Sequence, residues 1–126
     1  MKILSIVETA YRATLEEQDD TVLWLNHSLK NSGADISLLL RGNAVNYALR
    51  GHDASGLAIG ERKLVRGPAP DKDLEKLISA KVPVYVVEED LAKRGLPDDG
   101  IIGGLSKVSR RAIPELFERF DQVWHW

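Results

Sequence analysis

The sequence predicts a single α/β domain with three layers, in which helices cover both faces of a mostly parallel sheet of about five strands. Apolar stretches alternate along the chain with stretches of helical periodicity. The apolar runs at residues 37–40 and 82–87 do not alternate in polarity, which is typical of strands covered on both faces. The length of 126 residues suits one domain with a substantial core. No composition shift marks a boundary, so we expect one domain over residues 1–126.

The first predicted strand covers residues 2–7, and a helix follows it. Thr14 and Glu17 have the spacing of a capping box, in which each side chain accepts a hydrogen bond from a free backbone N–H at the helix start. Acidic residues that suit the positive end of the helix dipole lie early in this helix: Glu16, Glu17, Asp19 and Asp20. Its apolar face holds Val22, Leu25 and Leu29. Gly33 is the expected helix stop.

The middle of the chain predicts a strand, a short helix, a long loop and another helix. The strand covers residues 34–40, and the short helix after it has Asn43 as its expected N-cap. The expected inward residues of this helix are Ala44, Val45, Ala48 and Leu49. Residues 51–70 read as an irregular loop, and loops of this length usually carry a function or a small element of their own. The next helix has Asp71 as its expected cap, and its core residues are Leu74, Leu77 and Ile78.

The last third of the chain predicts three strands and two helices. The apolar run at residues 82–87 is a strand, and a short helix after it ends at Gly95. The stretch GIIGGL, residues 100–105, predicts a brief strand. Residues 109–120 predict a helix, and residues 121–126 a closing strand. The apolar stripe of that helix consists of Ile113, Leu116, Phe117 and Phe120.

The composition excludes several classes of function. The formal net charge of −2 gives no general attraction to nucleic acid or to acidic membranes, so we expect neither as a partner. The chain has no cysteine, which rules out disulfides, thiolate catalysis, persulfide chemistry and cysteine-ligated zinc. The N-terminal apolar run is too short for a signal peptide, and no stretch is long enough to cross a bilayer. We therefore expect a cytoplasmic protein.

No known catalytic or nucleotide-binding motif is present, whether a phosphate-binding loop, a dinucleotide fingerprint, a nucleophile elbow or a zinc-protease helix. No two of the three histidines His27, His52 and His125 have metal-ligand spacing, so we expect no metal and no cofactor. His52 follows a helix end in the long loop and is a candidate ligand-binding residue. An idle surface histidine is the competing interpretation.

Charged residues near the predicted strand ends have two interpretations each. Arg41 and the basic residues of the long loop could bind an anion or an acidic partner, or they could be ordinary solvated charges. Glu88, Glu89 and Asp90 could act as general acids or bases, or they could simply stabilise a helix dipole. Glu88 lies nearest the strand end. The ligand-binding candidates at the carboxyl edge of the sheet are Arg12, Arg41, Asn43, His52 and Glu88.

Trp124 and Trp126 lie two residues apart on the closing strand, so their side chains share one face. They belong either to the core or to a flat apolar patch at a subunit contact. A sequence that ends on tryptophan, with no polar tail, favours the contact. We therefore take both as interface candidates.

Four stretches together resemble the DsrE/DsrF-like family of intracellular sulfur-relay proteins, which includes the Tus proteins of tRNA thiolation. They are MKILSIV at residues 1–7, LLLRGNAVNYALRG at 38–51, VPVYVVEEDLAKRGL at 82–96 and FDQVWHW at 120–126. The third stretch is the most specific, with an apolar strand, a helix of two turns and then RGL. The resemblance covers almost the whole chain and implies a DsrE/DsrF-like domain.

The sequence departs from this family at the family's catalytic residue. In active members a cysteine lies just after the third strand, eight residues before the glycine of RG, and carries sulfur as a persulfide. Counting back from Gly95 leads to Val87, which has no nucleophile, so we expect no catalytic residue. The resemblance then implies a non-catalytic binding or scaffold subunit in sulfur trafficking, as a homo-oligomer or with paralogous subunits. The alternative is a small enzyme, or a sensor of an anion or small ligand, that uses non-thiol groups at the carboxyl edge.

Overall fold

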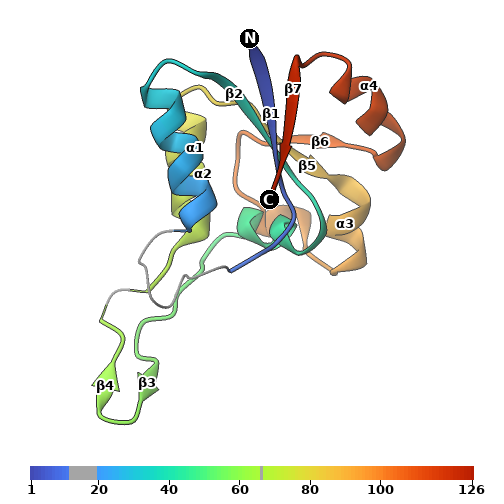
Figure 1. Cartoon of the computed structure of the whole chain (residues 1–126). Coiled ribbons are helices and arrows are strands. Elements are labelled where there is room, and N and C mark those ends of the chain that lie inside the picture. The colour runs from blue at the N-terminus through green and yellow to red at the C-terminus, as the bar shows by residue number, and fades with distance from the viewer. Residues whose placement is uncertain (12–19, 66) are drawn as a thin grey trace.

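The computed structural model describes residues 1–11, 20–65 and 67–126, and in these residues the chain forms a five-stranded sheet (Figure 1). The strands lie in the order β6-β5-β2-β1-β7, and every neighbouring pair is parallel. They are β1 (Lys2–Val7), β2 (Asp35–Leu40), β5 (Val84–Val87), β6 (Ser106–Val108) and β7 (Gln122–His125). The predicted three-layer α/β/α fold with a parallel sheet is confirmed.

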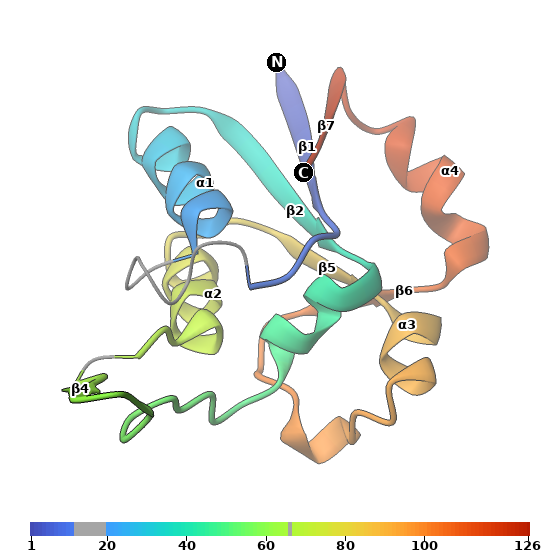
Figure 2. The same cartoon turned by 60° about the horizontal axis from the view of Figure 1, so that its bottom comes forward.

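Helices lie on both faces of the sheet because successive side chains of a strand point to opposite faces. Helices α1 (Thr21–Asn31) and α2 (Pro70–Ser79) cover one face, and α4 (Ile113–Phe117) covers the other (Figure 2). On β1, Ile3 and Val7 belong to the core on the α1 side, whereas Leu4 and Ile6 pack with Leu116 of α4. The 3₁₀ helix η1 (Gly42–Ala48) and helix α3 (Glu88–Lys93) lie near the carboxyl ends of the strands.

Helix α1 begins at Thr21, and Asp20 is its N-cap. The Asp20 Oδ1 atom accepts hydrogen bonds of 3.0 Å from the backbone N–H groups of Val22 and Leu23. The predicted capping box of Thr14 and Glu17, like Glu16 and Asp19, lies outside the described residues. The predicted stop is confirmed, since Gly33 follows the last turn with φ +94° and its N–H donates to the Lys30 carbonyl.

Two other predicted N-caps are wrong. Asn43 lies inside η1, which follows Arg41 and has no capping side chain. Asp71 lies in the first turn of α2, which begins one residue earlier because Pro70 fits a first helical position that needs no N–H. The buried Asp71 carboxylate accepts a hydrogen bond of 3.0 Å from the Gly51 N–H instead.

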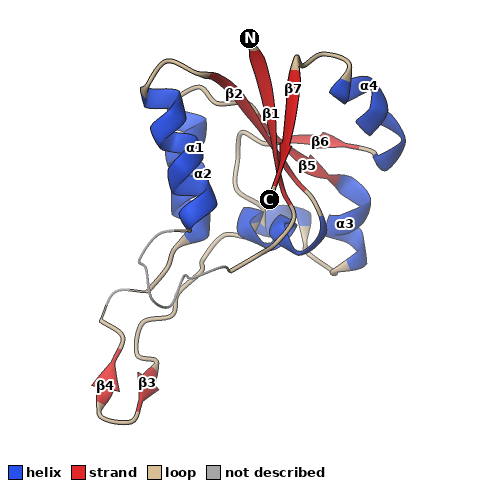
Figure 3. Ribbon diagram, viewed as in Figure 1, coloured by secondary structure: helices blue, strands red, loops and turns tan. Residues whose placement is uncertain are grey.

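The long loop contains a small antiparallel hairpin, formed by β3 (Ala58–Ile59) and β4 (Arg62–Lys63). The hairpin extends away from the sheet and helices (Figure 3). Three apolar side chains on or beside it are exposed: Leu57, Ile59 and Val65.

The predicted strand at residues 100–105 is wrong. Ile101 forms only an isolated bridge with Leu49, and the Ile102 N–H donates to the Ala48 carbonyl, so this apolar pair packs beside η1. The fourth strand of the sheet comes after the glycine turn, as β6. The last predicted helix is split into a 3₁₀ turn, Arg110–Ala112, and α4. None of the helices in the described part of the chain has the length and hydropathy of a membrane-spanning segment.

Candidate functional site

A pocket of about 350 Å³ lies at the carboxyl edge of the sheet. Glu8 directly follows β1, Arg41 follows β2, and Val87 ends β5. Parallel strands bring their carboxyl ends to the same edge, so residues far apart in the sequence meet there. The lining residues are Glu8, Arg41, Gly42, Val87, Asp90, Lys93, Arg94, Arg110 and Ile113.

The pocket is positively charged. Its lining has four cationic side chains and two carboxylates, which leaves an excess of two positive charges. The whole chain has a net charge of −2, so this excess is a local feature and does not follow from the composition. The interpretation of Arg41 as part of an anion-binding site therefore has more support than its interpretation as an ordinary solvated charge.

The Asp90 carboxylate connects three elements around the pocket. It is buried, its Oδ2 atom accepts a hydrogen bond of 2.8 Å from the Gly42 N–H, and its Oδ1 atom accepts one of 2.6 Å from Nη2 of Arg110. Gly42 has φ +57°, and a Cβ atom there would lie 3.1 Å from Cγ of Glu8, so glycine suits this close turn.

The pKa of Asp90 shows which role this carboxylate can have. Burial by itself would raise the pKa of Asp90, but the Gly42 hydrogen bond and the charges of Arg110 and Arg94 outweigh it and hold the pKa below its usual value. Asp90 is therefore ionised near neutral pH. It is suited to anchoring Arg110 and ill suited to donating a proton.

Glu8 joins the pocket to the closing strand. Its Oε2 atom lies 2.5 Å from Nε2 of His125 on β7 and 3.4 Å from Nη2 of Arg41. The hydrogen bond with His125 is the main cause that lowers the pKa of Glu8, and Arg41 adds to it. The Glu8 carboxylate thus offsets part of the Arg41 charge.

The two basic residues at the end of α3 differ in their contacts. Arg94 donates from Nη2 to Oδ1 of Asn43 at 2.8 Å and from Nη1 to the Asp90 carbonyl at 3.3 Å. Both acceptors are uncharged. Lys93 is exposed and forms no ion pair with any residue that the structure describes.

The structure brings only some of the sequence candidates to this pocket. Arg41 lines it, and Asn43 holds Arg94 from beside it. Arg12 lies outside the described residues. Glu88 is exposed in the first turn of α3 and does not line the pocket. His52 is also elsewhere, since its Nε2 atom lies 2.8 Å from the Asn46 carbonyl oxygen.

Sequence reasoning missed several of the lining residues: Glu8, Lys93, Arg94 and Arg110. Each lies one or two residues beyond a strand end, or in the helix or cap that follows one. Position relative to the end of a predicted strand is the signal that could identify them. It selects Arg41 and Glu88, and of these two only Arg41 lines the pocket. This signal does not identify Arg110, because the predicted strand covers residues 100–105 whereas the strand that precedes Arg110 is β6 (Ser106–Val108).

Val87 forms part of the pocket wall at the position where the family resemblance places a cysteine. Its side chain is only 1% exposed and belongs to the core on the α4 side, with Leu39 and Leu116 among its neighbours. No atom of this side chain can act as a nucleophile. The pocket therefore offers charge and hydrogen-bond donors without a group for covalent sulfur transfer.

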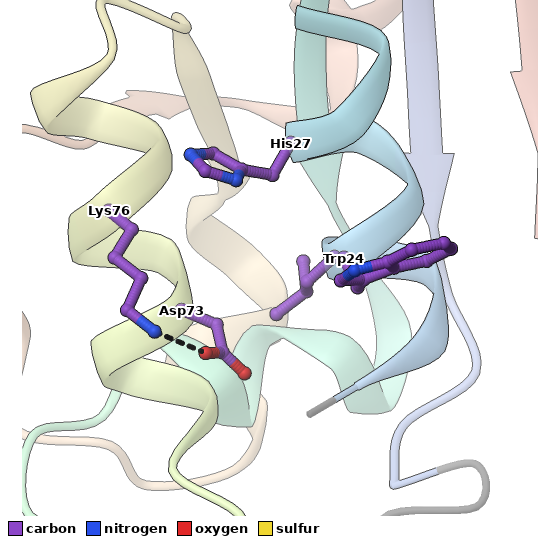
Figure 4. Close-up of a pocket in the computed structure, with 5 residues that line it drawn as sticks. Trp24, His27, Asp73 and Lys76 are labelled. Carbon is purple, nitrogen blue, oxygen red and sulfur yellow. Dashed lines mark ion pairs between the residues drawn. The ribbon is translucent and has the colours of Figure 1, made fainter. Parts of the chain in front are cut away.

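A second hollow lies between α1 and α2 and has a volume of about 50 Å³, room for only a few water molecules (Figure 4). Trp24 and His27 come from α1, and Asp73 and Lys76 from α2, with a Lys76–Asp73 ion pair of 3.7 Å. Trp24 is 57% exposed. This hollow is too small for an organic ligand.

Trp124 and Trp126 are both partly buried and pack against the core on the α1 side. Nε1 of Trp126 donates to Oγ of Ser5 at 2.9 Å, and Nε1 of Trp124 donates to Oε1 of Gln122 at 3.1 Å. Both residues thus have contacts within the chain. Their strand is the edge of the sheet, with β1 as its neighbour on one side.

Within the described residues, no group of three histidine, aspartate or glutamate side chains comes together in a way that could hold a metal ion. The pocket itself contains two carboxylates, and both already contact cationic side chains.

No protein-family model and no curated protein matches the chain. Several solved structures do. The YchN protein from E. coli has 24% identity and a TM-score of 0.72, with 100% of each chain covered. A protein of unknown function from Methanobacterium thermoautotrophicum has 14% identity and a TM-score of 0.62, with 98% of this chain and 97% of that chain covered. Another from Bacteroides thetaiotaomicron has 12% identity and a TM-score of 0.69, with 99% and 95% covered. These similarities show that the chain shares its fold with these proteins.

Proposed function

We propose that this chain is a non-catalytic DsrE/DsrF-like protein, an oligomeric binding or scaffold subunit linked to sulfur trafficking in the cytoplasm. The observation that supports this most directly is Val87, which lies in the wall of a basic pocket where the resemblance places a sulfur-carrying cysteine. The pocket is present, but the nucleophile is not. Binding without covalent transfer is the function that this combination favours.

The chemistry of the remaining pocket groups supports the same conclusion. Sulfane sulfur is passed on when a thiolate attacks the sulfane sulfur of a persulfide or polysulfide, so that a new S–S bond forms as the donor's S–S bond breaks and the donor leaves as a thiolate or a shorter polysulfide. Only cysteine supplies such a thiolate in a protein side chain. The chain has no cysteine at any position. The carboxylates, guanidinium groups and ammonium group of the pocket can hold an anion, but they cannot carry sulfur.

The assembly part of the proposal is supported by the edge strand. β7 pairs with β1 on one side, and Val123 on this strand is 40% exposed. Single exposed apolar residues are common, but an exposed valine on an edge strand that also carries a half-buried tryptophan on its opposite face suits a subunit contact. A second copy or a paralogous subunit would cover this edge.

A sulfur-loading experiment tests the non-catalytic role. The protein is incubated with inorganic polysulfide, desalted and analysed by intact mass spectrometry. We expect the unmodified mass and no sulfane sulfur in a cyanolysis assay. A stable increase by the mass of one or more sulfur atoms, in protein without any companion chain, would overturn the proposal.

The Val87→Cys variant tests whether this pocket is the equivalent of the family's sulfur site. We expect the new thiol to react with a disulfide reagent and to take up sulfur from polysulfide, because nearby cations stabilise a thiolate. Val86→Cys is the matched control, since Val86 is fully buried in the core on the other face of the same strand. We expect the Val87→Cys thiol to react at least about tenfold faster, because Val87 lines the pocket whose cations raise the thiolate fraction, whereas Val86 does not. Equal reactivity in the two folded variants would contradict the assignment of this position.

A further inference from the structure

We infer that the pocket at the carboxyl edge is a binding site for a small oxyanion that carries two negative charges, of the sulfate, thiosulfate and phosphate class. This inference names a ligand for the site of the proposed function and rests on that function in one respect, namely that this pocket is a binding site. Lys93, Arg94 and Arg110 are the residues that we assign to the anion.

The charge of the ligand follows from how the four cations are matched. Arg110 is paired with Asp90 at 2.6 Å, and Arg41 is paired with Glu8 at 3.4 Å. The other two cations are Arg94, which donates to the uncharged acceptors described above, and Lys93, which has no anionic partner among the described residues. The lining of the pocket thus has two more positive charges than negative ones. A dianion would neutralise this excess.

The guanidinium groups are held in place before any ligand binds. Arg94 is fixed by two hydrogen bonds, one to a side chain and one to the backbone. Arg110 is fixed by the buried Asp90 carboxylate, and its side chain is still 61% exposed. A guanidinium group has five N–H donors, so each keeps donors for a ligand after these contacts. Ordering that is already complete in the free protein reduces the free-energy cost of binding.

The size and lining of the pocket favour a small anion over a nucleotide. A volume of about 350 Å³ lies at the lower end of the range for small-molecule sites. The described lining residues include no aromatic side chain, so nothing there offers a stacking surface for a base. The apolar part of the wall consists of Val87 and Ile113, which strengthen nearby electrostatic contacts by excluding water. An oxyanion with tetrahedral geometry presents several acceptors to donors on different sides.

Isothermal titration calorimetry tests the site with three anions in separate arms: sulfate, thiosulfate and phosphate. Ionic strength is kept constant with sodium chloride, so that chloride serves as the singly charged competitor. Thermal shifts alone do not suffice, because sulfate and phosphate stabilise many proteins by exclusion from their surface. We expect saturable binding of at least one dianion. A preference for the sulfur anions over phosphate would connect the site to sulfur chemistry, and the reverse preference would identify a phosphate site.

The variant Lys93→Gln should weaken this binding about tenfold, which corresponds to the loss of one charge-assisted contact. Lys72→Gln is the matched control, because Lys72 is an exposed lysine on α2 that does not line the pocket. We expect its affinity to equal that of the parent protein. Arg94→Gln should weaken binding at least as much as Lys93→Gln.

Absence of saturable binding in all three arms, or an affinity unchanged by both pocket variants, would overturn the inference. These outcomes are independent of the sulfur-loading result. Failure to bind anions together with no sulfur uptake would remove only the anion site. Sulfur uptake by the parent protein with normal anion binding would remove only the non-catalytic role.

Discussion

Tyr47 places its hydroxyl group between two parts of the chain that are far apart in the sequence. The ring is fully buried, and its O–H donates to Oδ2 of Asp20 at 2.5 Å. The same oxygen accepts a hydrogen bond from the Tyr11 N–H, and the two tyrosine rings meet edge to face with centroids 5.3 Å apart. Asp20 also caps α1. This one hydroxyl therefore couples the start of α1 to η1.

The variant Tyr47→Phe should lower the free energy of unfolding by about 1–3 kcal/mol, because it removes the hydrogen bond to the buried Asp20 carboxylate and the one from the Tyr11 N–H. Urea denaturation at neutral pH measures this change. The matched control is Tyr85→Phe, since Tyr85 is only partly buried and packs its ring against Arg119. We expect a change of about 0.5 kcal/mol or less there. Equal effects in both variants would show that the Asp20 bond does not stabilise the fold.

The same tyrosine predicts a loss of stability at alkaline pH. Burial is the main cause that raises the pKa of Tyr47, and the Asp20 carboxylate raises it further. Above the ordinary value of 10.0, unfolded chains release this proton while folded chains keep it, so unfolding becomes more favourable as the pH rises. Stability measured from pH 9 to about 11 should fall more steeply in the parent protein than in Tyr47→Phe. If stability fell equally steeply with pH in the two proteins, the Tyr47 hydroxyl would not be the group whose raised pKa causes the loss.

Asp90 also connects separate elements, because its side chain on α3 accepts hydrogen bonds from η1 and from the turn before α4. Asp90→Asn keeps an acceptor for the Gly42 N–H but removes the charge that pairs with Arg110. We expect this variant to lose about 1–2 kcal/mol of stability at pH 7. Asp98→Asn is the control, since the Asp98–Lys107 pair is exposed and screened by solvent, so we expect a much smaller change in stability there.

The pH dependence of stability in the acid range tests the same contacts of Asp90 with Gly42 and Arg110. The net effect of the contacts around Asp90 is a lowered pKa, so its contribution to stability is present above the ordinary value of 3.8 and is lost as the pH falls below it. The difference between the parent protein and Asp90→Asn should therefore shrink in denaturation curves taken below pH 3.8. A difference that stays constant down to pH 2 would mean that the charge of Asp90 is not what stabilises the fold.

At the level of elements, the sequence predicts the central strands, which have long apolar runs, and the closing strand β7, but it does not predict β6. The runs at residues 2–7, 34–40 and 82–87 all became central strands, because a run that is apolar on both faces can be buried only inside such a sheet. The short apolar pair Ile101–Ile102 is buried equally well beside η1. β6 has exposed residues, so its hydrophobicity gave no signal.

For the molecule as a whole, the location of the site was easier to predict than its residues. Alternating strands and helices predict a parallel sheet, and a parallel sheet predicts a ligand site at its carboxyl edge. Which side chains meet there depends on the strand order β6-β5-β2-β1-β7, and this order requires contacts between distant segments. The Glu8–His125 and Asp90–Arg110 pairs span 117 and 20 residues. No local pattern in the sequence encodes such pairs.

The strand order also predicts where the chain would assemble. β6 and β7 are the two edges of the sheet, and β7 carries the exposed Val123 on the face opposite to Trp124. An edge with free backbone groups and apolar side chains favours pairing with another chain. We expect light scattering to give a mass above the 14.0 kDa of one chain, and Val123→Glu to reduce it towards that value, because a buried contact would then hold an unpaired charge.

Val65→Glu provides the matched comparison, since Val65 is 88% exposed and follows β4 of the hairpin, which extends away from the sheet and from β7 (Figure 1). Under the edge-strand proposal it should leave the mass unchanged, with circular dichroism confirming that both variants are folded. Loss of assembly in Val65→Glu alone would move the contact to the hairpin. A parent protein that stays at the mass of one chain, alone and mixed with a paralogous subunit, would show that this sheet edge does not serve as a subunit contact.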